Sequence, residues 1–194
     1  MLRLVLLCLL PATKLVAQVP PVTGSIEALR GEAHADSGHA LVRLQQVIPG
    51  LKLDIRYATP NNFTGKAQYT MAAAWLRQRP AQALARVQQQ LVTHGYALKV
   101  YDAYRPYAVT VSLWRSTTAH RFVANPRKGS QHNRGTAVDI TLIDLHTGAE
   151  MEMGTGYDNF TDSAHHEFKK LPAPVLARRR LLKELMTQNG FNAV

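Results

Sequence analysis

Alternating apolar and polar residues predict three strands. The first alternation covers residues 51–57, with apolar positions at Leu51, Leu53, Ile55 and Tyr57. This two-residue period is typical of a half-buried strand. The second alternation covers 96–100 and leads directly into Asp102-Ala103-Tyr104-Arg105-Pro106, and the third covers 136–142. We therefore expect Arg105 at the end of a strand, where the scaffold can hold its side chain over a pocket.

Three further segments are predicted to be helices. Residues 80–94 have apolar positions on one helix face, at Ala83, Leu84, Val87 and Leu91, and Gly95 follows as a C-terminal cap. A second helix is expected from Pro106 towards Thr117, because proline is tolerated in a first turn. A third is expected from about Ala173 to Asn189, with a core face of Val175, Leu176, Leu182, Leu185 and Met186. Together these elements predict an α+β fold in a single domain, with a small, mostly antiparallel sheet flanked by helices.

The beginning of the chain predicts export. Residues 1–17 combine a positive start, Met1-Leu2-Arg3, with an apolar run from Leu4 to Leu10 that is too short to span a bilayer, which is typical of a signal peptide. Residues 18–39 are rich in Pro, Gly, Ala and Ser and are expected to form a linker or loose arm. The folded domain is expected over 40–194, in the periplasm or outside the cell.

Composition narrows the chemistry. A chain of 194 residues with 46% hydrophobic content can form one globular domain. Its net charge of +10 fits a nucleic-acid binder, a protein at an anionic surface or a basic enzyme. Because the basic residues are scattered, we expect no nucleic-acid partner, and no membrane span after removal of the signal; the oligomeric state stays open. The only cysteine, Cys8, lies in the predicted signal, so a metal site must use His, Asp or Glu.

A candidate metal motif lies between Ser130 and Asp139. His132 and Asp139 flank an Arg-Gly turn, and imidazole nitrogen and carboxylate oxygen are zinc ligands. Gly135 allows the tight turn that would bring His132 back towards Asp139, which lies on the less apolar face of the predicted strand. The sheet is thus expected to carry the metal site. The alternative is that Asp139 makes a structural hydrogen bond and His132 is a surface loop residue.

Several motifs in unbroken order resemble the zinc D-alanyl-D-alanine dipeptidases associated with vancomycin resistance and peptidoglycan dipeptide recycling. They are Tyr57-Ala58-Thr59, Asn62-Phe63-Thr64-Gly65, Asp102 to Pro106, Ser130-x-His132-x-x-Gly135-x-Ala137-x-Asp139 and His165-His166. The Ser-x-His-x6-Asp element is shared with zinc D,D- and L,D-carboxypeptidases. The Asn-Phe-Thr-Gly segment and the histidine pair narrow the resemblance to the dipeptidases.

The resemblance implies a role for each matching residue. His132 and Asp139 match two of three ligands of a single Zn²⁺, and Arg105 matches the arginine that stabilises the charged transition state. Ser130 matches a residue that holds the substrate carboxylate, while Tyr57 and Asp158 match groups near the substrate's free amino end. The implied function is zinc-dependent hydrolysis of D-alanyl-D-alanine, a peptidoglycan precursor or turnover product.

Alternatives remain for individual residues. Arg105 could be an ordinary ion-pair partner of Asp102, and Tyr57 could simply fill the core. The pair His165 and His166 is expected to be structural or to support the site from outside it, because the family carries a similar pair in addition to its three ligands.

The end of the sequence departs from the family pattern. Family members continue beyond the part that corresponds to Gly190-Phe191 into a strand with Glu-x-Trp-His, which supplies the general base and the third zinc histidine, whereas this sequence ends at Val194. We therefore expect little activity and lowered stability from the 194-residue form. The alternative functions are a zinc D,D- or L,D-carboxypeptidase acting on peptidoglycan stem peptides, and a catalytically silent peptidoglycan-binding protein.

Overall fold

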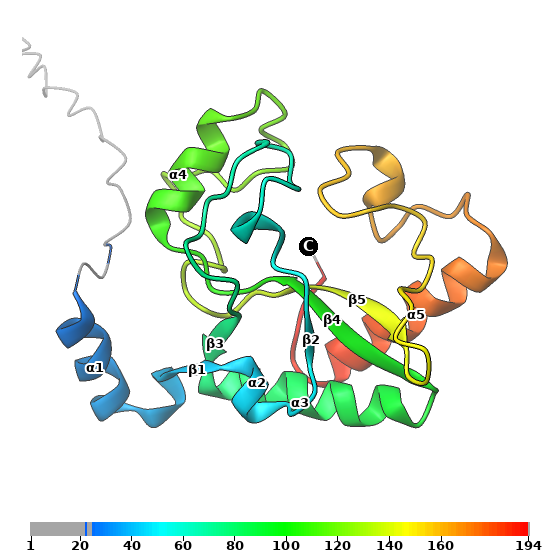
Figure 1. Cartoon of the computed structure of the whole chain (residues 1–194), viewed down its shortest axis with the longest axis horizontal. Helices are drawn as coiled ribbons and strands as arrows, with labels where there is room; N and C mark the ends of the chain where they lie inside the picture. The colour runs from blue at the N-terminus through cyan, green and yellow to red at the C-terminus, as the bar shows by residue number, and fades with distance from the viewer. Residues whose placement is uncertain (1–21, 23–24, 194) are drawn as a thin grey trace, which may run out of the picture.

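Two small sheets organise the described part of the chain, which comprises Val22 and residues 25–193 of this computed structural model (Figure 1). The helices are α1 (Ile26–Ala35), α2 (Leu44–Val47), α3 (Gln78–Val92), α4 (Tyr107–Arg115) and α5 (Ala173–Gln188). The strands are β1 (Leu41–Arg43), β2 (Lys52–Leu53), β3 (Trp75–Arg77), β4 (Tyr96–Asp102) and β5 (Asp139–Asp144). Short 3-10 turns are η1 (Ser37–His39), η2 (Arg56–Ala58) and η3 (Asp162–Ala164).

The sheets are mostly antiparallel, as predicted. Strand β1 pairs with β3 antiparallel, and the second sheet has the order β2-β4-β5, with β2 parallel and β5 antiparallel to β4. Leu98 lies opposite Leu142, but the register shifts after Val100, so that Asp102 faces Asp139. This shift brings two carboxylates together where β4 ends and β5 begins.

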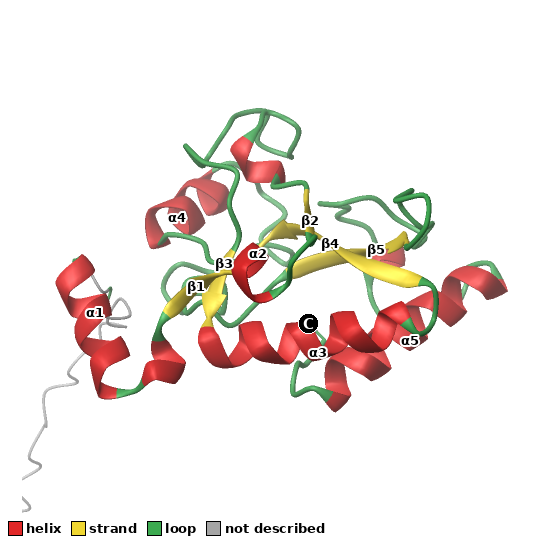
Figure 2. Ribbon diagram, turned by 60° about the horizontal axis from the view of Figure 1, so that its bottom comes forward, coloured by secondary structure: helices red, strands yellow, loops and turns green. Residues whose placement is uncertain are grey.

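Helices α3 and α5 cover one face of the three-stranded sheet, while α4 and the long loops lie on the other side (Figure 2). Their buried side chains form one core with the strands; its members include Leu84, Val87, Leu91, Leu98, Val100, Leu142 and Leu185. The predicted helices 80–94 and 173–189 agree with α3 and α5, and the helix predicted after Pro106 is α4. Of the predicted core face of α5, Val175 and Leu185 are buried, and the other members are partly exposed.

The prediction of a strand over 51–57 is wrong for most of its length. Only Lys52 and Leu53 pair with β4, and the main chain then turns through η2. Leu51, Ile55 and Tyr57 are nevertheless buried. The alternation thus indicated which side chains face inward. It did not indicate a strand, because a 3-10 turn can bury alternate residues without continuing the hydrogen bonds of a sheet.

Helix α1 lies inside the segment that was predicted to be a linker or loose arm. None of its residues is buried, but Glu32 pairs with Arg77 of β3 at 2.6 Å, so the segment contacts the folded domain. The domain boundaries stay predictions, and the predicted signal peptide lies outside the described residues. In the described part of the chain, no helix has the length and apolarity to cross a membrane.

Candidate metal centre

Three potential ligand residues meet at the ends of β4 and β5. Asp102 ends β4, Asp139 begins β5, and His132 comes from the loop that precedes β5. One ligand atom from each lies within 4.8 Å of the others, and no second group of this kind occurs among the described residues. The sequence motif supplied His132 and Asp139, whereas Asp102 enters only through the strand register.

The hydrogen bonds of His132 leave one ring nitrogen free for a metal. Nδ1 lies 2.7 Å from the carbonyl oxygen of Ala103, which assigns a proton to Nδ1, so that the neutral imidazole presents its lone pair at Nε2. Nε2 lies 3.4 Å from Oδ1 of Asp139. Two ligands bound to one tetrahedral zinc at about 2.0–2.1 Å are roughly 3.3 Å apart, so His132 and Asp139 fit a shared zinc ion.

The turn that carries His132 depends on Gly135 and Asn133. Gly135 has φ +68°, and a Cβ atom there would lie 2.9 Å from Cδ2 of Leu41. The side chain of Asn133 donates to the Arg105 carbonyl and to Thr110 Oγ1, each at 2.8 Å, and accepts from the Ser130 N–H. The turn that carries His132 is thereby fixed to the segment that contains Arg105.

Both carboxylate oxygens of Asp102 accept hydrogen bonds. Oδ1 accepts from the Tyr69 hydroxyl and the Ala103 N–H, while Oδ2 accepts from Nε and Nη2 of Arg105 at 2.9 and 2.6 Å. Burial raises the pKa of Asp102, but only the ionised carboxylate can accept from all of these donors, so we assign it as the charged partner of Arg105. Metal binding by Asp102 would compete with this pair, and we therefore assign Asp102 as the anchor of Arg105.

Arg105 is held against the candidate metal centre. Its side chain is buried, its Nη2 lies 4.0 Å from Oδ2 of Asp139, and its guanidinium lies 5.2 Å from the centre of the Tyr57 ring. Burial alone would lower the pKa of Arg105, but Asp102 and Asp139 outweigh burial and raise it. The sequence left open whether Arg105 pairs with Asp102 or serves the site, and the geometry allows both.

The ionisation of His132 and Asp139 follows from their contact. Burial would lower the pKa of His132, but Asp139 raises it above its ordinary value. Partial enclosure would raise the pKa of Asp139, but His132 and Arg105 lower it. In the metal-free protein the two groups therefore favour an ion pair, which a cation at this position would replace.

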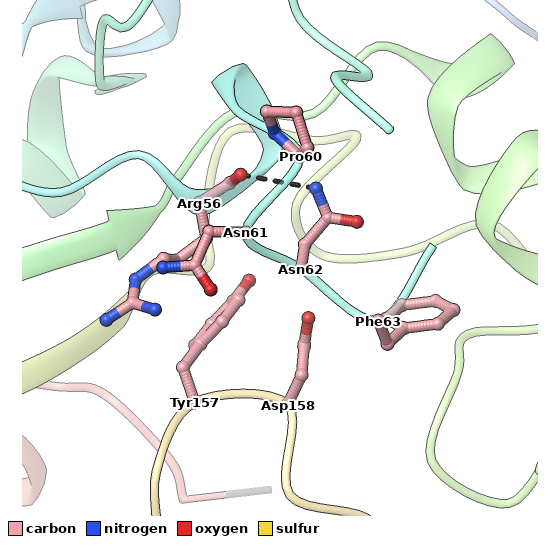
Figure 3. A pocket seen from close by; sticks show the side chains of 7 residues that line it. All are labelled: Arg56, Pro60, Asn61, Asn62, Phe63, Tyr157 and Asp158. Carbon is pink, nitrogen blue, oxygen red and sulfur yellow. Dashed lines mark hydrogen bonds between the residues drawn. The ribbon is translucent and has the colours of Figure 1, made fainter. Parts of the chain in front are cut away.

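Asp158 lines a second part of the site and is bonded to the buried Tyr57. The Tyr57 hydroxyl donates to Oδ1 of Asp158 at 3.1 Å, and Oδ2 of Asp158 is buried with no hydrogen-bond partner among the described residues. Figure 3 shows Asp158 beside Tyr157 at the edge of a cavity of about 250 Å³ that Arg56 and Phe63 also line. Burial raises the pKa of Asp158 to about 6. An unpaired buried carboxylate oxygen is costly in isolation and suits a cationic ligand.

Tyr157 joins this cavity to the candidate metal centre. Its hydroxyl donates to Oδ2 of Asp139 at 3.3 Å, and burial, followed by the charge of Asp139, raises the pKa of this phenol and keeps it protonated. Tyr157 was not predicted as a site residue. Its position beside Asp158 was the only signal in the sequence, and nothing in the sequence indicated Tyr69.

The remaining predicted residues fall into two groups. Ser130 is buried, and its hydroxyl accepts a hydrogen bond from the His132 N–H at 3.2 Å. Ser130 therefore lies at the site and stabilises the turn that carries His132. His165 stacks on Phe122, and neither His165 nor His166 belongs to the ligand group. The roles predicted for these residues in catalysis or support stay predictions.

Comparison with known proteins identifies the family. The family model described as D-ala-D-ala dipeptidase matches residues 37–194. A D-alanyl-D-alanine dipeptidase of Escherichia coli (strain K12) is 36% identical over 151 residues, which cover 78% of this chain and 78% of that protein. A D-alanyl-D-alanine dipeptidase of Enterococcus faecium is 31% identical over 170 residues, covering 77% of this chain and 84% of that protein.

The chain belongs to the D-ala-D-ala dipeptidase family. The resemblance inferred from the motifs is thereby confirmed, and the protein is a metallopeptidase of this family. The candidate metal site at the ends of β4 and β5 agrees with a metal-dependent family.

Proposed function

We propose that this dipeptidase-family protein uses zinc to hydrolyse D-alanyl-D-alanine, and that it selects the free dipeptide by binding its ammonium group at Asp158. The observation that supports this most directly is the buried Oδ2 of Asp158, which has no hydrogen-bond partner among the described residues. Asp158 lines a cavity that Tyr157 joins to the candidate metal centre. An ammonium group would supply the missing donor and the opposite charge. The substrate is the one named for the relatives in Escherichia coli and Enterococcus faecium.

Each side chain has a distinct task in this proposal. His132 Nε2 and Asp139 would hold the zinc ion, which supplies an activated water and polarises the scissile carbonyl when bound. Arg105 is fixed by Asp102 and stabilises the negative charge that develops on the carbonyl oxygen. Tyr57 orients Asp158 through their hydrogen bond. Ser130 is proposed to bind the substrate carboxylate, so that the two ends of the dipeptide are recognised separately.

The test compares three substrates on zinc-loaded protein. We expect release of D-alanine from D-alanyl-D-alanine, and none from N-acetyl-D-alanyl-D-alanine or from a longer peptide ending in D-alanyl-D-alanine. The assay uses protein in excess over substrate, so that a single round of cleavage is measured. Equal cleavage of the blocked or longer peptides would instead support a D,D- or L,D-carboxypeptidase. No cleavage, with sedimentation on purified cell wall, would support a silent peptidoglycan-binding protein.

The metal identity is tested separately. After chelation, we expect Zn²⁺ to restore hydrolysis and to raise the melting temperature, because a ligand that binds only the folded protein stabilises it. Another divalent ion that stabilises the protein more strongly and restores a faster reaction would contradict the assignment of zinc.

We also propose that the protein is exported and acts on peptidoglycan-derived dipeptide. The support is the basic and apolar pattern of residues 1–17. Cell fractionation with N-terminal sequencing should find a shortened chain outside the cytoplasm, and a full-length cytoplasmic chain would contradict export.

A further inference from the structure

The segment from Met153 to His165 contains much of the site proposed to bind the ammonium group of the substrate, but it has little regular structure. It contains Tyr157, which bonds to Asp139, and Asp158, which bonds to Tyr57. Its only regular element is η3. Asp158 has φ +55°, a backbone conformation that is costly for a residue other than glycine. Something must therefore hold this loop in place.

Arg179 of α5 holds both ends of the loop. At the entry, its Nε donates to the Met153 carbonyl at 2.6 Å. At the exit, its Nη2 donates to the Ser163 carbonyl at 2.9 Å, and its Nη1 to the His165 carbonyl at 3.2 Å. A planar guanidinium presents several donors in a fixed geometry on three nitrogens, so one side chain can bond to both ends of the loop, whereas the donors of a lysine all lie on one nitrogen.

The packing around this contact is close. Gly154 has φ +89°, and a Cβ atom there would lie 2.9 Å from Cδ1 of Leu171 and 3.3 Å from Nη2 of Arg179. Arg179 itself belongs to a helix whose Val175 and Leu185 are buried. The loop is thus attached to a rigid part of the core.

The tip of the loop is held by other contacts. Phe160 lies beside Phe63 and stacks on Phe122, with ring centres 5.2 and 5.3 Å apart. These aromatic contacts orient the tip, whereas Arg179 fixes the two ends from which Tyr157 and Asp158 extend into the site.

We propose that Arg179 is a positioning residue for substrate binding: by bonding to Met153, Ser163 and His165, it holds the loop so that Asp158 and Tyr157 face the site. This inference rests on the proposed function for the identity of the substrate. The hydrogen bonds between Arg179 and the loop are a property of the protein, and their effect on the loop can be measured without substrate. Arg179 does not touch the ligand group and is not a catalytic residue.

The experiment compares Arg179→Gln and Arg179→Lys with Arg180→Gln, a matched change at an exposed neighbour on the same helix. In Arg179→Gln we expect faster hydrogen exchange in residues 154–165, with unchanged exchange in β4. We also expect the pKa of Asp158, followed by carboxyl NMR, to fall from about 6 towards its ordinary value as the loop opens to water. Arg179→Lys should be intermediate, and Arg180→Gln should resemble the wild type.

Substrate kinetics supply the functional readout. With zinc-loaded protein in excess, we expect Arg179→Gln to raise the half-saturating concentration about tenfold while the maximal rate changes much less, because binding is lost equally in ground and transition states. A fall in maximal rate alone would overturn the positioning role. So would loop exchange equal to that of Arg180→Gln, or exchange raised equally in β4, which would indicate general destabilisation. If wild-type protein does not cleave the dipeptide, the proposed function fails, while the exchange and NMR measurements still decide whether Arg179 holds the loop.

Discussion

Nη2 of Arg105 lies 2.6 Å from Oδ2 of Asp102 and 4.0 Å from Oδ2 of Asp139, so one guanidinium stands between the carboxylates that end β4 and begin β5. The closer carboxylate is buried and accepts hydrogen bonds on both oxygens, while the more distant one faces His132 and is partly exposed. The two aspartates thus have different tasks, although both belong to the candidate ligand group.

Zinc affinity and the free energy of unfolding should distinguish the roles of Asp102 and Asp139. We expect Asp139→Asn to lower zinc affinity by more than about 100-fold, and Asp102→Asn by about 10- to 100-fold, which is the range for groups that only support a ligand. Asp102→Asn should instead destabilise the fold by about 3 kcal/mol or more, because it leaves a buried Arg105 without its counter-charge. Chelator competition measures the first effect and urea unfolding the second. Equal loss of zinc in both variants would make Asp102 a ligand.

Arg105 should be sensitive to a change that keeps its charge. A lysine cannot reproduce the two bonds to Oδ2 of Asp102, so Arg105→Lys should misplace the charge at the reacting carbonyl. We expect the maximal rate to fall on the order of 10²-fold, as for removal of one transition-state donor. The control is Arg115→Lys at the exposed end of α4, which should retain the wild-type rate. A rate for Arg105→Lys close to that of the control would contradict the assigned role.

Asp158 should make the protein less stable at neutral pH than in mild acid. Its folded-state pKa of about 6 lies above the ordinary value of 3.8, so the folded protein binds this proton more tightly than the unfolded chain. The stabilisation is complete below about pH 4 and is lost as the pH rises through about 6. Asp158→Asn should therefore raise the melting temperature at pH 7.5 but leave it nearly unchanged at pH 4. Asp162→Asn, at an exposed carboxylate, is the control and should show no such difference.

Gly135 lies in the turn that carries His132, and Gly148, in another turn, is a matched control for it. Both have positive φ, +68° and +70°, but an added Cβ meets Leu41 at 2.9 Å only at Gly135 and has nothing within 4 Å at Gly148. Gly148→Ala should cost about 1 kcal/mol from backbone strain alone. Gly135→Ala should cost at least about 1 kcal/mol more, because Leu41 must move, and should also weaken zinc binding. Equal unfolding free energies for the two variants would show that Leu41 moves without cost.

Local patterns were sufficient for the elements with a clear period. The helix predicted over 80–94 corresponds to α3, and the alternation over 96–100 corresponds to β4, because the inward-facing residues of each repeat at the period of a single element. Residues 51–57 show the limit of this reasoning. Their alternation recorded burial correctly, yet Tyr57 lies in a 3-10 turn, since a short pattern does not specify which neighbour completes the hydrogen bonds.

The sequence by itself determined the family and the class of fold, and it predicted His132, Asp139 and Arg105 as site residues, because these inferences depend on residue types at fixed spacings along the chain. Only the tertiary structure decided that Asp102 anchors Arg105, that Tyr157 reaches Asp139, and that Arg179 holds the loop of Asp158. Each of these contacts depends on a strand register or on the docking of a loop against a helix. Such long-range arrangements are selected by burial and hydrogen bonding in the whole molecule, and no short segment encodes them.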